Sequence, residues 1–206
     1  MTLSPRHPFT PTPTTLSPRH PDTPTPRHSV SSDVRRPTSD YVDVVIVGGG
    51  IAGSTLAIVL ARAGVAVAVV ERERAFRDRV RGEALMPWGA ALARELGILE
   101  ALAESGSRCL PIWQTYDGRE PLEPYDWRWD VPSGDAVWGV RHPGLQEVLL
   151  ERAAAEGATV LRPAKALRPR RSGGRLLLPV KTEGEDVTLS ARLVVGADGG
   201  ESSVRT

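Results

Sequence analysis

The sequence predicts an α/β fold that begins with a strand–helix–strand unit. Three observations carry this prediction. An apolar run over 42–47, interrupted only by Asp43, ends in a cluster of three glycines. An alanine-rich pattern with helical spacing follows to position 63, and a second apolar run over 65–70 ends in Glu71. Short apolar runs bounded by glycine are typical of buried strands, and a helix that connects two of them makes the pair parallel.

The turn between the first strand and the helix reads Gly48-Gly49-Gly50-Ile51-Ala52-Gly53. A GxGxxG turn in this context is typical of dinucleotide binding. Its first glycine allows the tight turn, its second lets the backbone approach a pyrophosphate, and its third lets the helix pack close to the sheet. The helix also directs free N–H groups and the positive end of its dipole at the anion. We therefore predict that these six residues bind a dinucleotide.

An acidic residue lies where the ribose of such a ligand is expected. Glu71 follows Gly50 by 21 positions, at the end of the second predicted strand. A carboxylate in this place accepts hydrogen bonds from an adenosine ribose. It favours FAD or NAD over NADP, a preference that is weakened because the basic residues Arg72 and Arg74 follow closely. Arg72 is itself a candidate cofactor-binding residue.

The remaining elements follow in order along the chain. A loop is expected over 72–81. A helix is expected over 87–95, with another turn toward 105. A further helix is expected over 142–156, and Gly157 provides its C-cap. The segment 109–132 is rich in Trp, Pro, Asp and Tyr and predicts short strands and turns over the sheet. Further strands are expected over 136–140, 159–161, 176–181, 187–189 and 192–195.

The first 39 residues differ in composition from the rest. They are rich in proline, threonine and serine, and TLSPRHP occurs at 2–8 and again at 15–21. Proline removes hydrogen-bond donors and restricts the residue before it, so we expect a disordered tail over 1–39 and one domain over 40–206. A proline-rich recognition segment is the alternative interpretation of the tail.

The bulk composition excludes several classes of function. A net charge of +1 gives no global field that would attract nucleic acid or a membrane surface. Cys109 is the only cysteine, which fits a reducing cytoplasm, and three of the four histidines lie in the tail, so no metal site is expected. No catalytic acid–base pair is predicted from the sequence, and the sequence gives no prediction of the oligomeric state.

The C-terminal string resembles a known motif. Positions 196–205 read GADGGESSVR, which is similar to the GADGxxSxVR motif of the para-hydroxybenzoate hydroxylase-like flavoprotein monooxygenases. Arg81, at the start of RGEALMP, and Arg141, after Val140, resemble two arginines of that family that lie near the flavin. The resemblance thus implies five further FAD-binding residues, Arg81, Arg141, Asp198, Gly199 and Arg205. It also implies that Asp198 and Arg205 take part in binding a nicotinamide cofactor.

The resemblance implies a fold and an activity. The fold is a Rossmann-like FAD-binding βαβ domain with an inserted β-meander and part of a substrate-side sheet. The activity is hydroxylation of an aromatic or polycyclic small molecule, with FAD as cofactor, NADH or NADPH as transient co-substrate, and no catalytic side chain assigned. The third motif of the family, a strand-end Gly-Asp, has no counterpart here. The chain therefore resembles the N-terminal half of such an enzyme, and the fragment itself is expected to be inactive.

Three alternatives stay open. The stretch 127–132, WRWDVP, resembles the WxWxIP signature of flavin-dependent halogenases. In those enzymes the signature lies after the motif that 196–205 resembles, whereas here it lies before it. They also have a catalytic lysine in the first third of the fold, whereas Lys165 and Lys181, the only lysines, lie late in this chain. A flavin reductase or dehydrogenase, such as a prenyl reductase, shares the same first domain. A non-catalytic remnant would neither hold flavin nor turn over.

Overall fold

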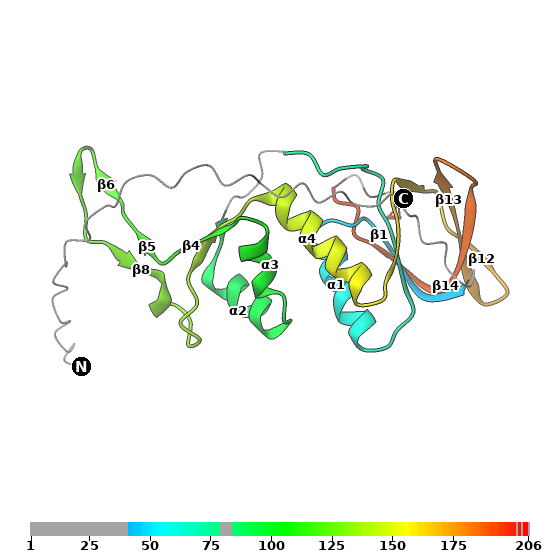
Figure 1. Cartoon of the computed structure of the whole chain (residues 1–206), viewed down its shortest axis with the longest axis horizontal. Helices are drawn as coiled ribbons and strands as arrows, with labels where there is room; N and C mark the ends of the chain where they lie inside the picture. Colours follow the sequence, from blue (N-terminus) through cyan, green and yellow to red (C-terminus); the bar gives the residue numbers. More distant parts are fainter. Residues whose placement is uncertain (1–40, 79–83, 201, 203, 206) are drawn as a thin grey trace. The chain divides into compact units, whose positions relative to one another are not determined.

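In the part of the chain that the structure describes, the main sheet has seven strands in the order β10-β2-β1-β14-β13-β11, with β12 paired to β13. Strands β1, β14, β13 and β12 of this sheet are labelled in Figure 1. The computed structural model describes residues 41–78, 84–200, 202, 204 and 205. The strands of this sheet are β1 Tyr41–Val47, β2 Val67–Val70, β10 Thr159–Leu161, β11 Ala164–Ala166, β12 Arg170–Ser172, β13 Arg175–Thr182 and β14 Val187–Gly196. Strands β10, β2, β1 and β14 are parallel, whereas β14, β13, β11 and β12 pair antiparallel. The predicted α/β class with an antiparallel meander is confirmed.

The four parallel strands end at the same level. Val47 of β1 lies opposite Val70 of β2 and opposite Gly196 of β14, and Val70 lies opposite Leu161 of β10. Four carboxyl ends therefore form one edge of the sheet, which is where open α/β sheets bind ligands.

Among the described residues, four helices and one short 3-10 turn accompany the sheets. They are α1 Ile51–Arg62, α2 Pro87–Glu95, α3 Leu99–Glu104, α4 His142–Ala155 and η1 Trp127–Trp129. Proline lies in the first turn of α2 and of α4, where its fixed φ suits the helix and its missing N–H costs nothing. Within the described part of the chain, no helix has both the length and the apolar character that crossing a membrane requires.

The alternation of side chains in β1 divides the core into two layers. Val44 and Ile46 pack with α1 and α4 on one face of the sheet. Val45 and Val47 pack on the other face with residues of the meander such as Leu178. Both faces are covered, as a parallel sheet requires, and the near-continuous apolar character of 42–47 follows from this.

Ion pairs connect the helices at their exposed ends. Arg62 of α1 binds Glu156 just after α4, with 2.7 Å between Nη2 and Oε1. Arg152 of α4 binds Glu104 of α3 with an Nη2–Oε1 distance of 2.8 Å. These partly exposed pairs add little stability compared with the apolar contact of α1 with α4.

The short strands predicted within 109–132 are present. They are β4 Arg108–Leu110, β5 Ile112–Trp113, β6 Tyr116–Asp117, β7 Glu120–Pro121 and β8 Tyr125–Asp126. Strand β4 joins β3 Ala84–Leu85 and β9 Val137–Gly139 in a three-stranded sheet, while β5 pairs with β8 and β6 with β7. Trp127 packs edge-on against Trp113 and Tyr125, with ring centroids 5.7 and 5.2 Å apart. Through these contacts Trp127 is an apolar anchor of the short strands.

Two assignments from the sequence need correction. The strands expected over 187–189 and 192–195 are one strand, β14, because β1 and β13 pair with it on both sides and carry it through Ser190 and Ala191. The helix predicted over 87–95 is α2, and the further turn toward 105 is α3, with Gly97 at φ of +65° between them. Strands β11 and β12 were not expected, since their Ala, Lys and Arg residues have low strand propensity.

Candidate functional site

A cleft of about 370 Å³ opens at the edge formed by the four parallel strand ends. Its lining comes from the residues that directly follow β1, β2 and β14, from the segment after β2, from the first turns of α4 and from β11. The lining residues are Val47, Gly48, Gly50, Ile51, Ala52, Val70, Glu71, Arg72, Glu73, Phe76, Arg77, His142, Gln146, Ala164, Lys165, Ala166, Ala197, Asp198 and Gly199. Eight of the predicted cofactor-binding residues are among them.

The glycines of the turn have three different surroundings. A Cβ on Gly53 would overlap the carbonyl oxygen of Gly48 and lie 3.2 Å from Ile46, so α1 approaches the strand end as closely as a helix can. Gly48 has φ of +104°, and a Cβ there would lie 2.7 Å from the carbonyl carbon of Ala197. A Cβ on Gly50 would meet only Gln146 Nε2 at 3.6 Å, so the approach to this backbone from the cleft is open. These surroundings match the three roles expected of the glycines.

The second motif adjoins the first through the pairing of β14 with β1. The Ala197 N–H donates to the carbonyl of Val47, with 2.7 Å between nitrogen and oxygen. Asp198 and Gly199 then enter the cleft lining beside Gly48 of the glycine turn. Two stretches far apart in the sequence thus form one site because their strands are neighbours.

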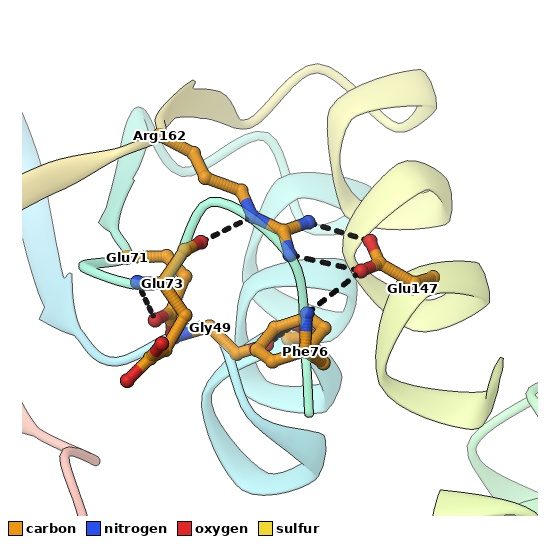
Figure 2. A network of polar contacts seen from close by, with 7 residues as sticks. Gly49, Glu71, Glu73, Phe76, Glu147 and Arg162 are labelled. Atoms are coloured by element: carbon orange, nitrogen blue, oxygen red, sulfur yellow. Dashed lines mark hydrogen bonds and ion pairs between the residues drawn. The ribbon is translucent and has the colours of Figure 1, made fainter. Parts of the chain in front are cut away.

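Glu71 is buried at the end of β2, with 5% of its surface exposed. Its Oε2 accepts a hydrogen bond from the Gly49 N–H at 2.6 Å, and its Oε1 accepts one from the Glu73 N–H at 2.7 Å (Figure 2). An ionised carboxylate has about four acceptor positions, so two remain for hydroxyl donors from the cleft. The carboxylate therefore has the capacity to bind a diol while it holds the glycine turn in place.

The other predicted residues lie away from the lining. Gly49 and Gly53 face the protein, where Gly49 bonds Glu71 and Gly53 packs against Gly48. The exposed Arg141 precedes α4, and its N–H donates to Ser107 Oγ at 3.1 Å. Arg205 Nη2 donates to the carbonyl of Gly200 at 2.8 Å. Arg81 lies outside the described residues. The roles of these three arginines in cofactor binding stay predictions.

Sequence reasoning missed the residues of α4 and β11 that line the cleft. His142 and Gln146 are one helical turn apart and face the glycine turn, whereas Leu145 and Leu149 of the same helix are buried in the core. This i, i+4 polar pair beside an apolar stripe was the available signal. Lys165 lies between the buried residues Ala164 and Ala166 on β11, a strand that the sequence pattern did not reveal.

A network of polar contacts holds the chain after Glu71 against α4 (Figure 2). Arg162, which follows β10, forms a bidentate ion pair with Glu147 of α4 at Nη1–Oε2 and Nη2–Oε1 distances of 2.5 and 2.9 Å. Glu147 Oε1 also accepts the Phe76 N–H at 3.1 Å. Burial alone would raise the pKa of Glu147, but the hydrogen bonds from Arg162 and Phe76 and the charge of Arg162 together hold the pKa below its usual value.

The lowered pKa of Glu147 predicts how the stability of the protein depends on pH. The ionised form is favoured in the folded state, so its contribution is complete above the unfolded pKa and is lost as the pH falls through the lower, folded pKa. We expect Glu147→Gln to lower the free energy of unfolding at pH 7, and we expect the difference from wild type to shrink below about pH 4.5. Urea unfolding between pH 7 and pH 3 measures this difference. A difference that stays constant over the range would contradict the expectation.

The cleft offers binding groups but few reactive ones. It presents backbone N–H groups at the start of α1, the carboxylates of Glu71 and Asp198, and a mixture of basic and apolar side chains. Within the described ranges, no group of three or more His, Cys, Asp or Glu side chains could hold a metal ion. This arrangement can bind an anionic, diol-containing ligand, and the ligand itself must supply any redox chemistry.

Comparison with known proteins identifies the family. A family model described as FAD binding domain matches residues 41–206. The 6-methylpretetramide 4-monooxygenase of Streptomyces rimosus is 35% identical over 174 residues, which cover 82% of this chain and 42% of that protein. A chlorinase of Pseudomonas fluorescens, which acts on a 1H-pyrrole-2-carbonyl-(peptidyl-carrier protein), is 31% identical over 180 residues, with coverages of 78% and 39%.

Solved structures share the fold. The p-nitrophenol 4-monooxygenase PnpA from Pseudomonas putida DLL-E4 superposes with a TM-score of 0.69 at 24% identity, covering 80% of this chain and 43% of that one. The chain spans less than half the length of each of these three proteins.

Proposed function

Because the chain belongs to the FAD binding domain family, we propose that its cleft binds FAD as part of a monooxygenase that hydroxylates an aromatic or polycyclic small molecule. The observation that carries the proposal is the meeting of three groups at one sheet edge. They are the open backbone at Gly50, the buried acid Glu71, and Asp198 of the second motif. The monooxygenase relative from Streptomyces rimosus supports the choice of reaction.

The residues of the cleft fit the adenosine and pyrophosphate half of FAD. The start of α1 at Gly50 would hold the pyrophosphate with N–H groups and the positive dipole end. Glu71 would accept hydrogen bonds from the adenosine ribose, with Arg72 beside it. Asp198 and Gly199 would bind FAD from the strand end next to the glycine turn. When bound, FAD would supply the redox chemistry and the activation of oxygen.

We also propose NADH or NADPH as the reductant, a small-molecule substrate as the partner, and a cytoplasmic location. The resemblance of 196–205 to a motif that serves both cofactors supports the first. A net charge of +1 gives no reason to expect nucleic acid as a partner. Cys109 is a free thiol, which is compatible with a reducing compartment.

Titration of the purified chain with FAD tests the cofactor assignment. We expect saturable binding at one FAD per chain, followed by the change in flavin fluorescence and by the tryptophan signal of the protein. ADP should compete, because it carries the adenosine and pyrophosphate groups that the cleft fits. Absence of saturable FAD binding would overturn the proposal.

Halogenation is the second candidate, favoured by the chlorinase relative. The signature-like stretch 127–132 does not add to it, because Trp127 packs in an aromatic cluster with Trp113 and Tyr125. The two reactions differ in the atom they add to the substrate. Mass spectrometry of the product formed in the presence of chloride and oxygen by a protein that contains this domain separates them.

Glu71→Ala should weaken FAD binding by about 1–3 kcal/mol, the scale of a hydrogen bond to a charged group. The variant loses the acceptor for the ribose and also frees the N–H groups of Gly49 and Glu73, which the carboxylate holds. Flavin titration measures the loss. Glu73→Ala is the matched control, since Glu73 lines the same cleft through a more exposed side chain. A large loss of affinity in Glu73→Ala with none in Glu71→Ala would show that Glu73, and not Glu71, binds the ribose.

A further inference from the structure

One wall of the cleft has no regular secondary structure. Residues 72–78, which we call the wall segment, follow β2 without forming a helix or strand, yet Arg72, Glu73, Phe76 and Arg77 all line the cleft. A segment of this kind samples many conformations unless other elements hold it. Its position must therefore come from contacts with the rest of the chain.

Arg162 supplies several of these contacts from the end of β10. Its Nε donates to the carbonyl oxygen of Glu73 at 2.7 Å, while its two terminal nitrogens bind Glu147. The guanidinium carbon also lies 4.3 Å from the centre of the Phe76 ring. The side chain of Arg162 is only 14% exposed, so these contacts are formed away from bulk water.

Glu147 completes the network from the side of α4. Its carboxylate binds Arg162 and accepts the Phe76 N–H, so the wall segment is held at two backbone positions, the Glu73 carbonyl and the Phe76 amide. The ion pair of Arg74 with Glu183 also reaches the wall segment, but both side chains are more than half exposed, and such pairs contribute little.

We propose that Arg162 and Glu147 are positioning residues that form the wall of the nucleotide site before the cofactor binds. Neither residue lines the cleft, and each acts through neighbours that do. A preformed wall removes the entropy cost of ordering 72–78 on binding, and this gain appears as affinity. The inference rests on the proposed function for the identity of the ligand, FAD.

The contacts at the Glu73 carbonyl and at the Phe76 amide depend on the geometry of the Arg162 guanidinium as well as on its charge. A guanidinium presents donors in a planar fork, so Arg162 can bind both oxygens of Glu147 and the Glu73 carbonyl together. A lysine in this place keeps the charge opposite Glu147 but cannot reproduce the whole set. Arg162→Lys should therefore retain most of the thermal stability and still bind FAD more weakly than wild type.

Hydrogen exchange of the chain without cofactor tests the wall directly. In Arg162→Met, we expect the amide of Phe76, followed in a peptide that covers 72–77, to exchange at least tenfold faster than in wild type. The matched control is Arg152→Met, which removes another α4 ion pair, that with Glu104, at a side chain of similar burial (20% exposed). This control should leave exchange over 72–77 unchanged. Equal exchange in Arg162→Met and wild type would overturn the inference.

FAD titration of wild type, Arg162→Met, Arg162→Lys and Arg152→Met tests the consequence for binding. We expect the Kd to rise about tenfold or more in Arg162→Met, to rise less in Arg162→Lys, and to stay unchanged in Arg152→Met. An unchanged Kd in Arg162→Met would overturn the positioning role, even if the variant is less stable. If wild type itself bound no FAD, the proposed function would fail, while the exchange measurement would still decide whether the two residues hold the wall.

Discussion

Gly53→Val is expected to abolish FAD binding and to destabilise the fold by about 3 kcal/mol, the upper range of overpacking costs. The Cβ alone overlaps the carbonyl oxygen of Gly48, and this atom belongs to the backbone at the end of β1, which is paired on both sides. The helix can accept the side chain only by moving away from the sheet. That movement displaces the start of α1 from the place where the pyrophosphate is expected.

The sign of this effect opposes the helix propensity at position 53. Gly→Ala in a helix interior gains up to about 1 kcal/mol of propensity, so a substitution without a clash would stabilise α1. We expect Gly53→Ala to destabilise nonetheless, as measured by urea unfolding. Gly184→Val serves as the control, because the nearest atom to a Cβ there is Thr182 Oγ1 at 3.9 Å, in a turn away from the cleft. A stabilised Gly53→Ala would show that α1 is not packed as closely as described.

Gly50→Val is expected to remove FAD binding while leaving the fold intact. The backbone at Gly50 has φ of −67° and ψ of −174°, which any residue adopts, and a Cβ there reaches Gln146 Nε2 only at 3.6 Å. The added methyl groups would extend into the cleft where the pyrophosphate must approach. We expect the free energy of unfolding to stay within about 0.5 kcal/mol of wild type. The Kd for FAD should rise at least about 100-fold, which corresponds to about 2.7 kcal/mol.

Comparison of the two glycine variants separates binding from folding. Flavin content after denaturation and the urea midpoint are measured on both proteins. Gly53→Val should lose both, and Gly50→Val should lose only the flavin. If Gly50→Val retained its flavin, the pyrophosphate would not lie at the start of α1, and the assignment of the glycine turn would fail.

The sequence predicted the part of the cleft whose residues lie close together in the chain. Gly48, Gly50 and Glu71 belong to one strand–helix–strand unit, in which the order of residues along the chain determines their order in space. Backbone requirements at such a turn allow few residue types, so the pattern is specific. The resemblance then added Asp198 and Gly199, which the pairing of β14 with β1 brings to the same edge.

The remaining walls could not be predicted because they depend on pairings between distant strands. Lys165 lines the cleft from β11, whose Ala-Lys-Ala sequence has no strand pattern. Arg162 follows β10, which pairs with β2, and reaches the wall segment at the Glu73 carbonyl. Glu147 had no local signal at all, since its role depends on Arg162 and on the backbone of Phe76. Propensity and periodicity describe single elements, whereas these contacts are properties of the tertiary fold.

The position of β1 in the sheet has a consequence for the order of folding. One neighbour, β2, follows closely in the chain, but the other, β14, pairs Gly196 with Val47 across roughly 150 positions of sequence. Contacts of such separation form late, because the entropy of closing a long loop must be overcome first. Until β14 is synthesised and inserted, the apolar β1 would remain an open edge, available to other chains. During synthesis this edge is therefore a place where the chain is prone to aggregate.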